Sequence, residues 1–387
     1  MAPINFRKIR RLYSERLWGS LTRAKNRHVA ELLKYIEIKL LGRHASTRCR
    51  FQPSHVLIEL TTRCNLRCQW CNQNDPVWQH AYGHEDMPFA MFESIVSQLK
   101  GTRILLLYNI GEPLLYPRII DAVRVARRYV PEVRLTSNGL LWTPRIARDI
   151  RAAGLTQLNI SVDSPDPALM QRIRGADLAT IERNIRDIGS ACDLPIEIWT
   201  VITTDNHRSL LDLPQWAAQF PAIKSLRFQL QKGTHSVDRT GLDPLTDRAG
   251  FERFRESLIA ACVRYGLASN SASLPFYLDG FAQRQAQGIC QASFNQLVAV
   301  NVRGEMAPCC TYGTFSVGSV ARDGFRQVWN GPGMIAWRED MLNQRYGSYC
   351  SNWCGYRQGH PQAGLPESAD GRTLAGTNDS DPVPDRR

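Results

Sequence analysis

Short apolar runs alternate with longer amphipathic stretches along most of the chain, beginning at residue 51. The runs are rich in Val, Ile and Leu, which is typical of buried strands, and the stretches repeat their apolar side chains at helical intervals. Strands are predicted over residues 56–60, 103–108, 133–136, 157–162, 196–202 and 225–229, and helices near 90–100, 119–129, 144–153, 179–192 and 209–219. This alternation predicts an α/β fold with parallel strands and crossover helices.

Six strand–helix units are fewer than the eight of a complete TIM barrel. We therefore expect a partial (βα)6 TIM-like barrel over residues 51–235, with its ligand site at the carboxyl ends of the strands. A helical bridge, with a helix near 248–265, is expected over residues 236–285. Residues 286–360 carry further cysteines and are expected to form a small C-terminal domain. Residues 361–387 are rich in Pro, Gly, Ser and Asp, so we expect a disordered tail.

The first 50 residues form a basic segment whose apolar positions follow helical turns over residues 4–42. This segment carries 13 Lys or Arg against Glu15, Glu31 and Glu37, which is +10 of the chain's net +12. Two interpretations stay open. A basic amphipathic helix can contact an anionic membrane surface, RNA or another acidic partner. Alternatively, it packs on the flank of the main domain with its charges in water. DNA is not an expected partner.

The apolar runs and the cysteines restrict the compartment. The longest apolar run, residues 104–108, is too short to span a bilayer. No charged and then apolar leader with a small-residue cleavage site is present, so secretion is not expected. Eleven cysteines in such a chain indicate metal binding rather than disulfides. We expect a cytoplasmic protein, with peripheral membrane contact left open for the basic helix.

Cys64, Cys68 and Cys71 lie just after the first predicted strand. Thiolates are the ligands of iron–sulfur clusters, and three of them can hold three irons of a cubane while leaving the fourth iron open to a substrate. Two alternatives are a zinc site, which usually shows Cys-x2-Cys pairs, and reduced cysteines that pack in the core.

The spacing Cys-x3-Cys-x-Trp-Cys resembles the signature of radical S-adenosylmethionine (SAM) enzymes. The resemblance implies that the three cysteines bind a 4Fe–4S cluster and that the free iron chelates the amino and carboxylate groups of SAM. It also implies reductive cleavage of SAM to a 5′-deoxyadenosyl radical that removes a hydrogen atom from the substrate. An electron donor such as flavodoxin or ferredoxin would be required.

Polar loops follow the next strands and extend this resemblance. Ile110-Gly111-Glu112-Pro113 resembles the Gly-Gly-Glu-Pro motif that binds the SAM amino group, with Ile110 in place of the first glycine. The ends of the third and fourth strands are assigned by the same resemblance to the SAM carboxylate, the ribose and the nearby substrate. The candidates there are Ser137, Asn138, Ser161 and Asp163.

Three further polar residues are open to more than one interpretation. Arg174, followed by Gly175, would pair with the SAM carboxylate or a substrate oxygen, or else is a surface arginine beside a loop glycine. Thr200 and Asn206 are pocket candidates after the fifth strand, although Asn206 would equally cap the next helix.

The second set of cysteines resembles the C-terminal extension of SPASM and twitch radical SAM enzymes. A full SPASM domain needs about seven cysteines, so the shorter twitch type with one auxiliary 4Fe–4S cluster fits better. The resemblance assigns four ligands to that cluster: Cys290, Cys309, Cys350 and Cys354. Cys310 could replace Cys309, have a structural role, or serve as a catalytic hydrogen-atom donor. A zinc site is the alternative for the whole set.

The substrate is the least determined part of the prediction. The first interpretation is a small polar molecule, a sugar or cyclitol, oxidised or epimerised at a carbinol carbon by a dehydrogenase or epimerase. The second is modification of a ribosomally made peptide. The wholly helical first 50 residues count against it, because peptide maturases often begin with a leader-binding module that contains strands. A third is a non-catalytic Fe–S or zinc protein that binds RNA or membrane.

Overall fold

The computed structural model describes residues 36–38, 40–41, 44–74, 83–230, 248–274, 294, 297–309, 315–343 and 345. A ten-stranded sheet forms its centre, in the order β10-β9-β8-β1-β2-β3-β4-β5-β6-β7. The strands are β1 (His55–Ile58), β2 (Ile104–Leu107), β3 (Glu132–Ser137), β4 (Gln157–Ser161), β5 (Ile196–Ile202), β6 (Ile223–Leu230), β7 (Ala268–Ser269), β8 (Leu297–Val300), β9 (Glu305–Ala307) and β10 (Gly318–Ser319).

Strands β1 to β6 are all parallel and lie in chain order, each bonded to the next. These are the six strands that the apolar runs predict, and the predicted partial barrel is confirmed. Because all six run in the same direction, their carboxyl ends meet along one edge of the sheet. The loops that leave these ends are therefore brought together.

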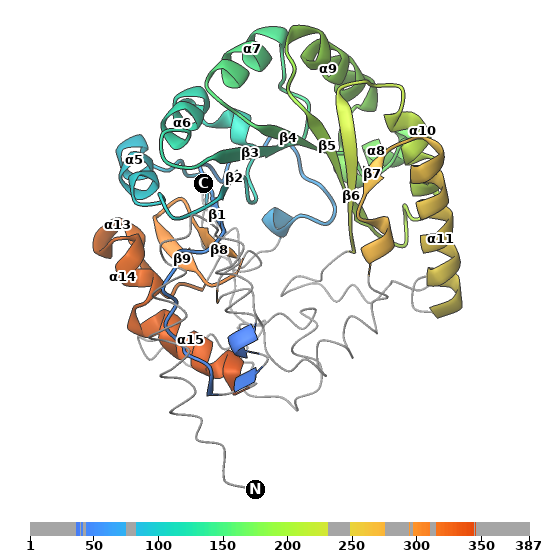
Figure 1. Ribbon diagram of the computed structural model, residues 1–387. Coiled ribbons are helices and arrows are strands. Elements are labelled where there is room, and N and C mark those ends of the chain that lie inside the picture. Colours follow the sequence, from blue (N-terminus) through green and yellow to red (C-terminus); the bar gives the residue numbers. More distant parts are fainter. Residues whose placement is uncertain are drawn as a thin grey trace, which may run out of the picture.

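Helices cover the outer face of this curved sheet, as Figure 1 shows. The described helices of the barrel are α5 (Phe89–Ser97), α6 (Ile119–Ala126), α7 (Pro144–Ala152), α8 (Pro167–Arg174), α9 (Leu178–Ala191) and α10 (Leu213–Ala217). Short 3-10 turns η3 (Asn72–Asn74), η4 (Pro113–Leu115) and η5 (Ser209–Leu211) occupy loops between them. The five predicted helices correspond to α5, α6, α7, α9 and the η5–α10 pair.

Alternation along β3 separates an apolar outer face from a polar inner face. In β3, Val133 and Leu135 are buried in the core under the helices, whereas Arg134 and Thr136 point the other way. Burial of the apolar set stabilises the sheet by roughly 25 cal/mol per Å² removed from water. The inner face of β3 is left with groups that form hydrogen bonds, whereas the inner faces of β1, β2 and β8 carry a small apolar cluster that includes Leu57, Leu106 and Ala299.

Within the barrel, helix α8 was not predicted from the apolar pattern. Its signals are at its ends: Asp166 caps Ala168 and Leu169 through its side chain, and Pro167 occupies the first turn. Gly175 ends it in the left-handed conformation at φ 68°, which glycine adopts without a steric penalty. Arg174 is consequently the last residue of a helix rather than part of a loop.

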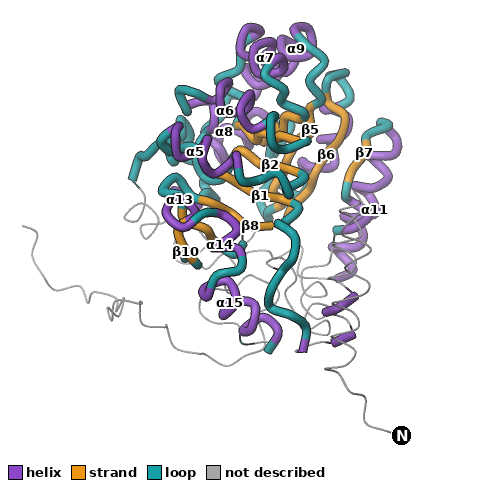
Figure 2. The backbone as a smooth tube through the Cα atoms, turned by 60° about the vertical axis from the view of Figure 1, so that its left-hand side comes forward, coloured by secondary structure: helices purple, strands orange, loops and turns teal. Residues whose placement is uncertain are grey.

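The C-terminal region continues the same sheet. Strand β8 pairs in parallel with β1, and β9 and β10 follow in antiparallel order. Helices α13 (Val320–Asp323), α14 (Phe325–Trp329) and α15 (Pro332–Leu342) lie at this end, while α11 (Arg248–Arg264) lies at the other, beside β7 (Figures 1 and 2). The predicted tail over residues 361–387 lies outside the described residues.

Only the end of the basic N-terminal segment is described. Ile38 and Leu41 are buried in the main core, so the end of this segment is anchored to the barrel. The prediction of a helix over residues 4–42 otherwise lies outside the described residues. Among the helices that are described, none is long and apolar enough to cross a membrane.

Candidate functional site

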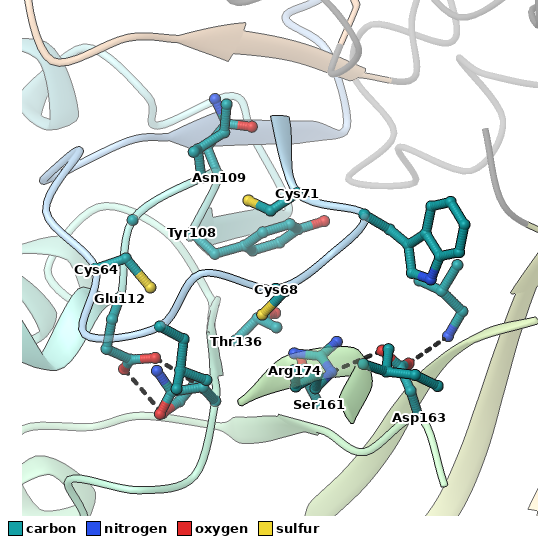
Figure 3. A pocket seen from close by; sticks show the side chains of 18 of the residues that line it. Cys64, Cys68, Cys71, Tyr108, Asn109, Glu112, Thr136, Ser161, Asp163 and Arg174 are labelled. Atoms are coloured by element: carbon teal, nitrogen blue, oxygen red, sulfur yellow. Dashed lines mark hydrogen bonds and ion pairs between the residues drawn. The ribbon is translucent and has the colours of Figure 1, made fainter. Parts of the chain in front are cut away.

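A cavity of about 310 Å³ lies at the carboxyl ends of the parallel strands. The three clustered cysteines all line it, and Figure 3 shows their sulfur atoms around the same space. Residues from the ends of β2, β3, β4, β5 and β6 complete its wall. The site is where the parallel sheet predicts it.

The cysteine loop is held by hydrogen bonds at both ends. The Asn74 side chain donates to the Cys68 carbonyl at 2.6 Å, and the Gln73 side chain donates to the Thr62 carbonyl at 2.6 Å. The Cys71 amide donates to the Cys68 carbonyl at 3.0 Å. These contacts fold the loop so that its three thiols face the cavity.

Burial raises the pKa of all three thiols, to about 11 for Cys71. Around Cys68 the guanidinium of Arg174 lowers the pKa, because a positive charge favours the thiolate. The thiols therefore keep their protons until a metal displaces them.

The donor set fits a cluster better than a single ion. Among the described residues, no three His, Cys, Asp or Glu side chains are gathered closely enough to hold one metal ion. A zinc ion needs its ligands converging on one point at about 2.3 Å, whereas each iron of a cluster takes its own sulfur. Three thiols spread around one cavity suit the second case. Their assignment as cluster ligands stays a prediction.

Gly111 brings the second loop against the first. A Cβ at this position would lie 2.1 Å from the Thr61 carbonyl oxygen and 2.8 Å from that of Arg63. The Glu112 amide donates to the Arg63 carbonyl at 2.8 Å, so the two backbones are bonded here. Glycine is required because a larger residue would push the loop away from the segment that leads into Cys64.

The Glu112 carboxylate is buried in the cavity wall and accepts three hydrogen bonds. Its Oε1 accepts from the Ser137 hydroxyl at 2.8 Å and from the Leu114 amide at 3.2 Å. Its Oε2 accepts from the Asn138 amide at 2.7 Å. A carboxylate offers about four acceptor positions, so Oε2 has one left for a ligand. Burial raises the pKa of Glu112 to about 7, although these donors oppose the rise.

Asn138 joins the third strand's end to the cysteine loop. Its side-chain amide donates to the Asn65 side-chain oxygen at 2.7 Å, and its own oxygen accepts from the Leu140 amide at 3.0 Å. Ser137 and Asn138 line the cavity as predicted.

Asp163 and Arg174 form a buried ion pair in the wall. Arg174 Nε donates to Asp163 Oδ2 at 2.7 Å, and the side chains are only 13% and 6% exposed. Asp163 Oδ1 accepts from the Val201 amide at 2.8 Å. The alternative of a surface arginine is wrong. Both Asp163 oxygens hold protein donors, so we propose that Asp163 positions Arg174 beside Cys68.

Most predicted SAM-site residues are brought together, but three are not. Gly111, Glu112, Ser137, Asn138, Ser161, Asp163 and Arg174 all line the cavity. Pro113 does not line it and begins η4. Thr200 donates to the Val162 carbonyl, and Asn206 donates to the Asp163 and Val201 carbonyls. Both are buried and outside the lining set, so they support the loops rather than face the cavity.

The prediction missed several residues of the wall. Tyr108 and Asn109 follow β2, Trp70 lies in the cysteine loop, and Gln229 lies on β6. Continuing the alternation of β2 and β6 to their ends would have placed Tyr108 and Gln229 on the inner face.

The predicted auxiliary site is described only in part. Cys309 packs against the inner-face apolar cluster that includes Leu57 and Leu106. Cys290, Cys310, Cys350 and Cys354 lie outside the described residues, so the ligand set and the role of Cys310 stay predictions.

Comparisons with known proteins agree with this geometry. The profile of the radical SAM superfamily matches residues 58–212, and that of an iron–sulfur cluster-binding domain, SPASM, matches residues 290–355. PqqA peptide cyclase of Xanthomonas oryzae pv. oryzae is 27% identical over 268 residues, 66% of this chain and 68% of the cyclase. GTP 3′,8-cyclase of Peptoclostridium acidaminophilum is 32% identical over 153 residues, 38% of this chain and less than half (46%) of that enzyme.

Solved structures share the fold. Streptococcus suis SuiB superposes with a TM-score of 0.61 at 15% identity, covering 91% of this chain and 82% of SuiB. SuiB bound to its precursor peptide SuiA superposes with a TM-score of 0.58 at 14% identity, covering 78% and 69%.

The pKa of Glu112 gives a prediction for SAM binding. If the Glu112 carboxylate accepts a hydrogen bond from the SAM amino group, affinity for SAM will weaken as the pH falls below about 7, because the carboxyl then carries a proton. The limiting slope is about tenfold per pH unit. Equilibrium dialysis of SAM against reconstituted protein across this range measures the effect, and Glu112→Gln is expected to remove the pH dependence.

Glu59 offers the matched control. Burial raises its pKa to about 7 as well, but the side chain does not line the cavity. Glu59→Gln is therefore expected to keep the pH dependence of SAM binding. Equal pH profiles for Glu112→Gln and the wild type would contradict the assigned role of Glu112.

Proposed function

Because this chain belongs to the radical SAM superfamily and carries a SPASM iron–sulfur domain, we propose that it modifies a ribosomally synthesised peptide. The observation that carries the proposal is the alignment with PqqA peptide cyclase, which extends over two thirds of both chains. The alignment with GTP 3′,8-cyclase covers 38% of this chain, about the length of the radical SAM match alone, and so bears on the cofactor chemistry rather than on the substrate.

The proposal replaces the sugar or cyclitol as first choice of substrate. The sequence argument against a peptide was the lack of strands in the first 50 residues, a segment of which the structure describes only residues 36–38, 40–41 and 44–50. For a sugar, the expected reaction was oxidation or epimerisation at a carbinol carbon. For a peptide, we propose instead that a hydrogen atom is abstracted from a residue of the peptide, as a first step towards cyclisation. SuiB, which shares the fold of this chain, has been solved with its precursor peptide SuiA bound. This is compatible with the proposal.

The cavity residues have separable tasks. When bound, a 4Fe–4S cluster and SAM would supply the electron and the radical chemistry that removes a hydrogen atom from the substrate. The thiols of Cys64, Cys68 and Cys71 would hold the cluster. Glu112 would orient the SAM amino group, and the Arg174 guanidinium, held in place by Asp163, would donate hydrogen bonds to the SAM carboxylate or a substrate oxygen.

The auxiliary domain fits an electron-transfer role. Its cluster would be held by Cys290, Cys309, Cys350 and Cys354, and four protein ligands leave no iron open to a substrate. An external reductant is required for turnover, and flavodoxin or ferredoxin are the candidates that we propose.

Release of 5′-deoxyadenosine tests the proposal. The protein is reconstituted anaerobically with iron and sulfide and supplied with SAM, reductant and size-fractionated host extract. We expect a peptide-sized fraction to raise 5′-deoxyadenosine release, and protease treatment of that fraction to remove the effect. Stimulation by the small-molecule fraction alone, resistant to protease, would contradict peptide modification and restore the sugar interpretation.

A further inference from the structure

A row of three side chains crosses the inner face of the sheet beside the SAM cavity. Ser161 on β4 is the register partner of Trp199 on β5, and Trp199 is the partner of Arg227 on β6. Partners in parallel strands project from the same face. Since Ser161 lines the cavity, Trp199 and Arg227 continue its wall outward across β5 and β6, which lie next to each other in Figure 1.

Trp199 is fixed at the boundary of the cavity. Its ring meets the ring of Tyr108 edge-on, with 5.5 Å between the centroids, and Tyr108 lines the cavity. Its indole nitrogen donates to Glu197 Oε2 at 2.5 Å. The ring therefore cannot swing away without losing both contacts, and it forms a rigid platform next to the reacting centre.

Glu197 is fully occupied by the protein. Besides the indole, Oε2 accepts from Arg227 Nε at 3.1 Å and from the Gln157 side chain at 3.3 Å. Its Oε1 accepts from the Ser225 hydroxyl at 3.0 Å. With four donors, this buried carboxylate positions its neighbours and has little capacity left to bind a ligand.

Arg227 is different. Its guanidinium lies 5.7 Å from the centre of the Trp199 ring, and its side chain is 41% exposed. Only Nε is engaged: within the described part of the chain, its two terminal nitrogens donate to no other residue. One edge of the guanidinium is thus held by Glu197 while the terminal N–H groups remain available. Such an arrangement suits bidentate binding of a carboxylate.

We propose that Arg227, supported by Trp199, binds a carboxylate of the peptide substrate and so places the neighbouring residue beside the SAM cavity. The inference rests on the proposed function for the identity of the substrate. Arg227 acts in positioning and specificity rather than in the chemical step. The carboxylate can belong to an acidic side chain or to the C-terminus of the peptide.

Binding of three small probes tests the subsite without turnover. N-acetylglutamate amide carries a side-chain carboxylate, N-acetylglutamine a C-terminal one, and N-acetylglutamine amide neither. Saturation-transfer NMR with the oxidised, SAM-loaded holoenzyme measures their relative binding. We expect at least one carboxylate probe to bind about tenfold or more tightly than the neutral amide. The preferred probe identifies the source of the carboxylate.

Substitutions at Arg227 test whether the preference for a carboxylate probe depends on its guanidinium group. Arg227→Gln is expected to abolish the preference for a carboxylate, and Arg227→Lys to retain part of it as a single charge. The matched control is Arg186→Gln. Like Arg227, Arg186 lies over an aromatic ring, that of Phe220, and pairs with a glutamate, Glu182. Arg186 lies on helix α9, however, in the outer layer of helices. The ratio between probes within one variant does not depend on the amount of folded protein.

The outcomes separate the subsite from the proposed function. Equal binding of all three probes to the wild type, or an unchanged preference in Arg227→Gln, would overturn the subsite even if a peptide fraction stimulates 5′-deoxyadenosine release. A preference that depends on Arg227 supports the subsite. If the peptide fraction then fails to stimulate release, the substrate class is wrong and the carboxylate site stands.

Discussion

Replacing Cys68 with alanine is expected to abolish SAM cleavage. Cys68 is the middle cysteine of the loop. Burial raises the pKa of its thiol, and the positive charge of Arg174 is the strongest effect that lowers this pKa. Without this thiol one iron of the cluster loses its protein ligand, and a two-cysteine loop does not hold a SAM-binding 4Fe–4S cluster. The measurement is anaerobic 5′-deoxyadenosine release, together with iron and sulfide content.

Cys64→Ala and Cys71→Ala are expected to behave in the same way, because all three thiols face one cavity. The control is Cys192→Ala. Cys192 follows helix α9, where its thiol is partly buried against the core and lies 3.6 and 3.7 Å from two backbone carbonyl oxygens, away from the residues that line the cavity. Its loss is expected to cost about 1 kcal/mol or less in the free energy of unfolding and to leave SAM cleavage intact. Full activity in any of the three loop variants would refute the assignment of the cluster ligands.

Adding a single methyl group at Gly111 is expected to have the next largest effect. The alanine Cβ would lie 2.1 Å from the Thr61 carbonyl oxygen, an overlap with backbone that no side-chain rotation relieves. Either the Glu112 loop or the segment leading to Cys64 must move. We expect a loss of about 1–3 kcal/mol in the free energy of unfolding. We also expect at least about a tenfold loss of SAM affinity, because Glu112 shifts with the loop.

Gly266→Ala distinguishes this steric effect from a general loss of stability. Gly266 has φ at 66° and nothing within 4 Å of an added Cβ, so its substitution costs backbone strain of about 1 kcal/mol without a collision. It lies after helix α11, away from the residues that line the cavity. Thermal unfolding and SAM dialysis of both variants make the comparison. Equal SAM affinity in Gly111→Ala and Gly266→Ala would contradict the steric account.

Local pattern was sufficient to predict the frame of the barrel. The apolar runs predict all six parallel strands within a few residues, because each run is a buried strand with helices on one face. Helix α8 was missed although its clear signals, Asp166 and Gly175, lie at its ends. That omission matters for the site, because α8 is what buries Arg174 against Asp163.

The cysteine motif, the Gly-Glu-Pro loop and the polar strand ends identify the cofactor chemistry without any coordinates. They succeed because each motif is short and continuous in the sequence. Thr200 and Asn206 were assigned to the cavity from position alone, and the structure corrects this. Their side chains satisfy buried carbonyl groups, a requirement that depends on how neighbouring loops pack.

The sequence by itself determined the positions of six strands along the chain, the three clustered cysteines and the family of chemistry, because those features are local. Only the tertiary structure decided that Gly111 touches the Thr61 carbonyl, that β8 extends the sheet beside β1, and that Trp199 and Arg227 continue the row of Ser161. Each of these depends on the register between segments far apart in the chain. Register is set by the packing of the whole sheet, since a shift of one residue moves every side chain to the opposite face.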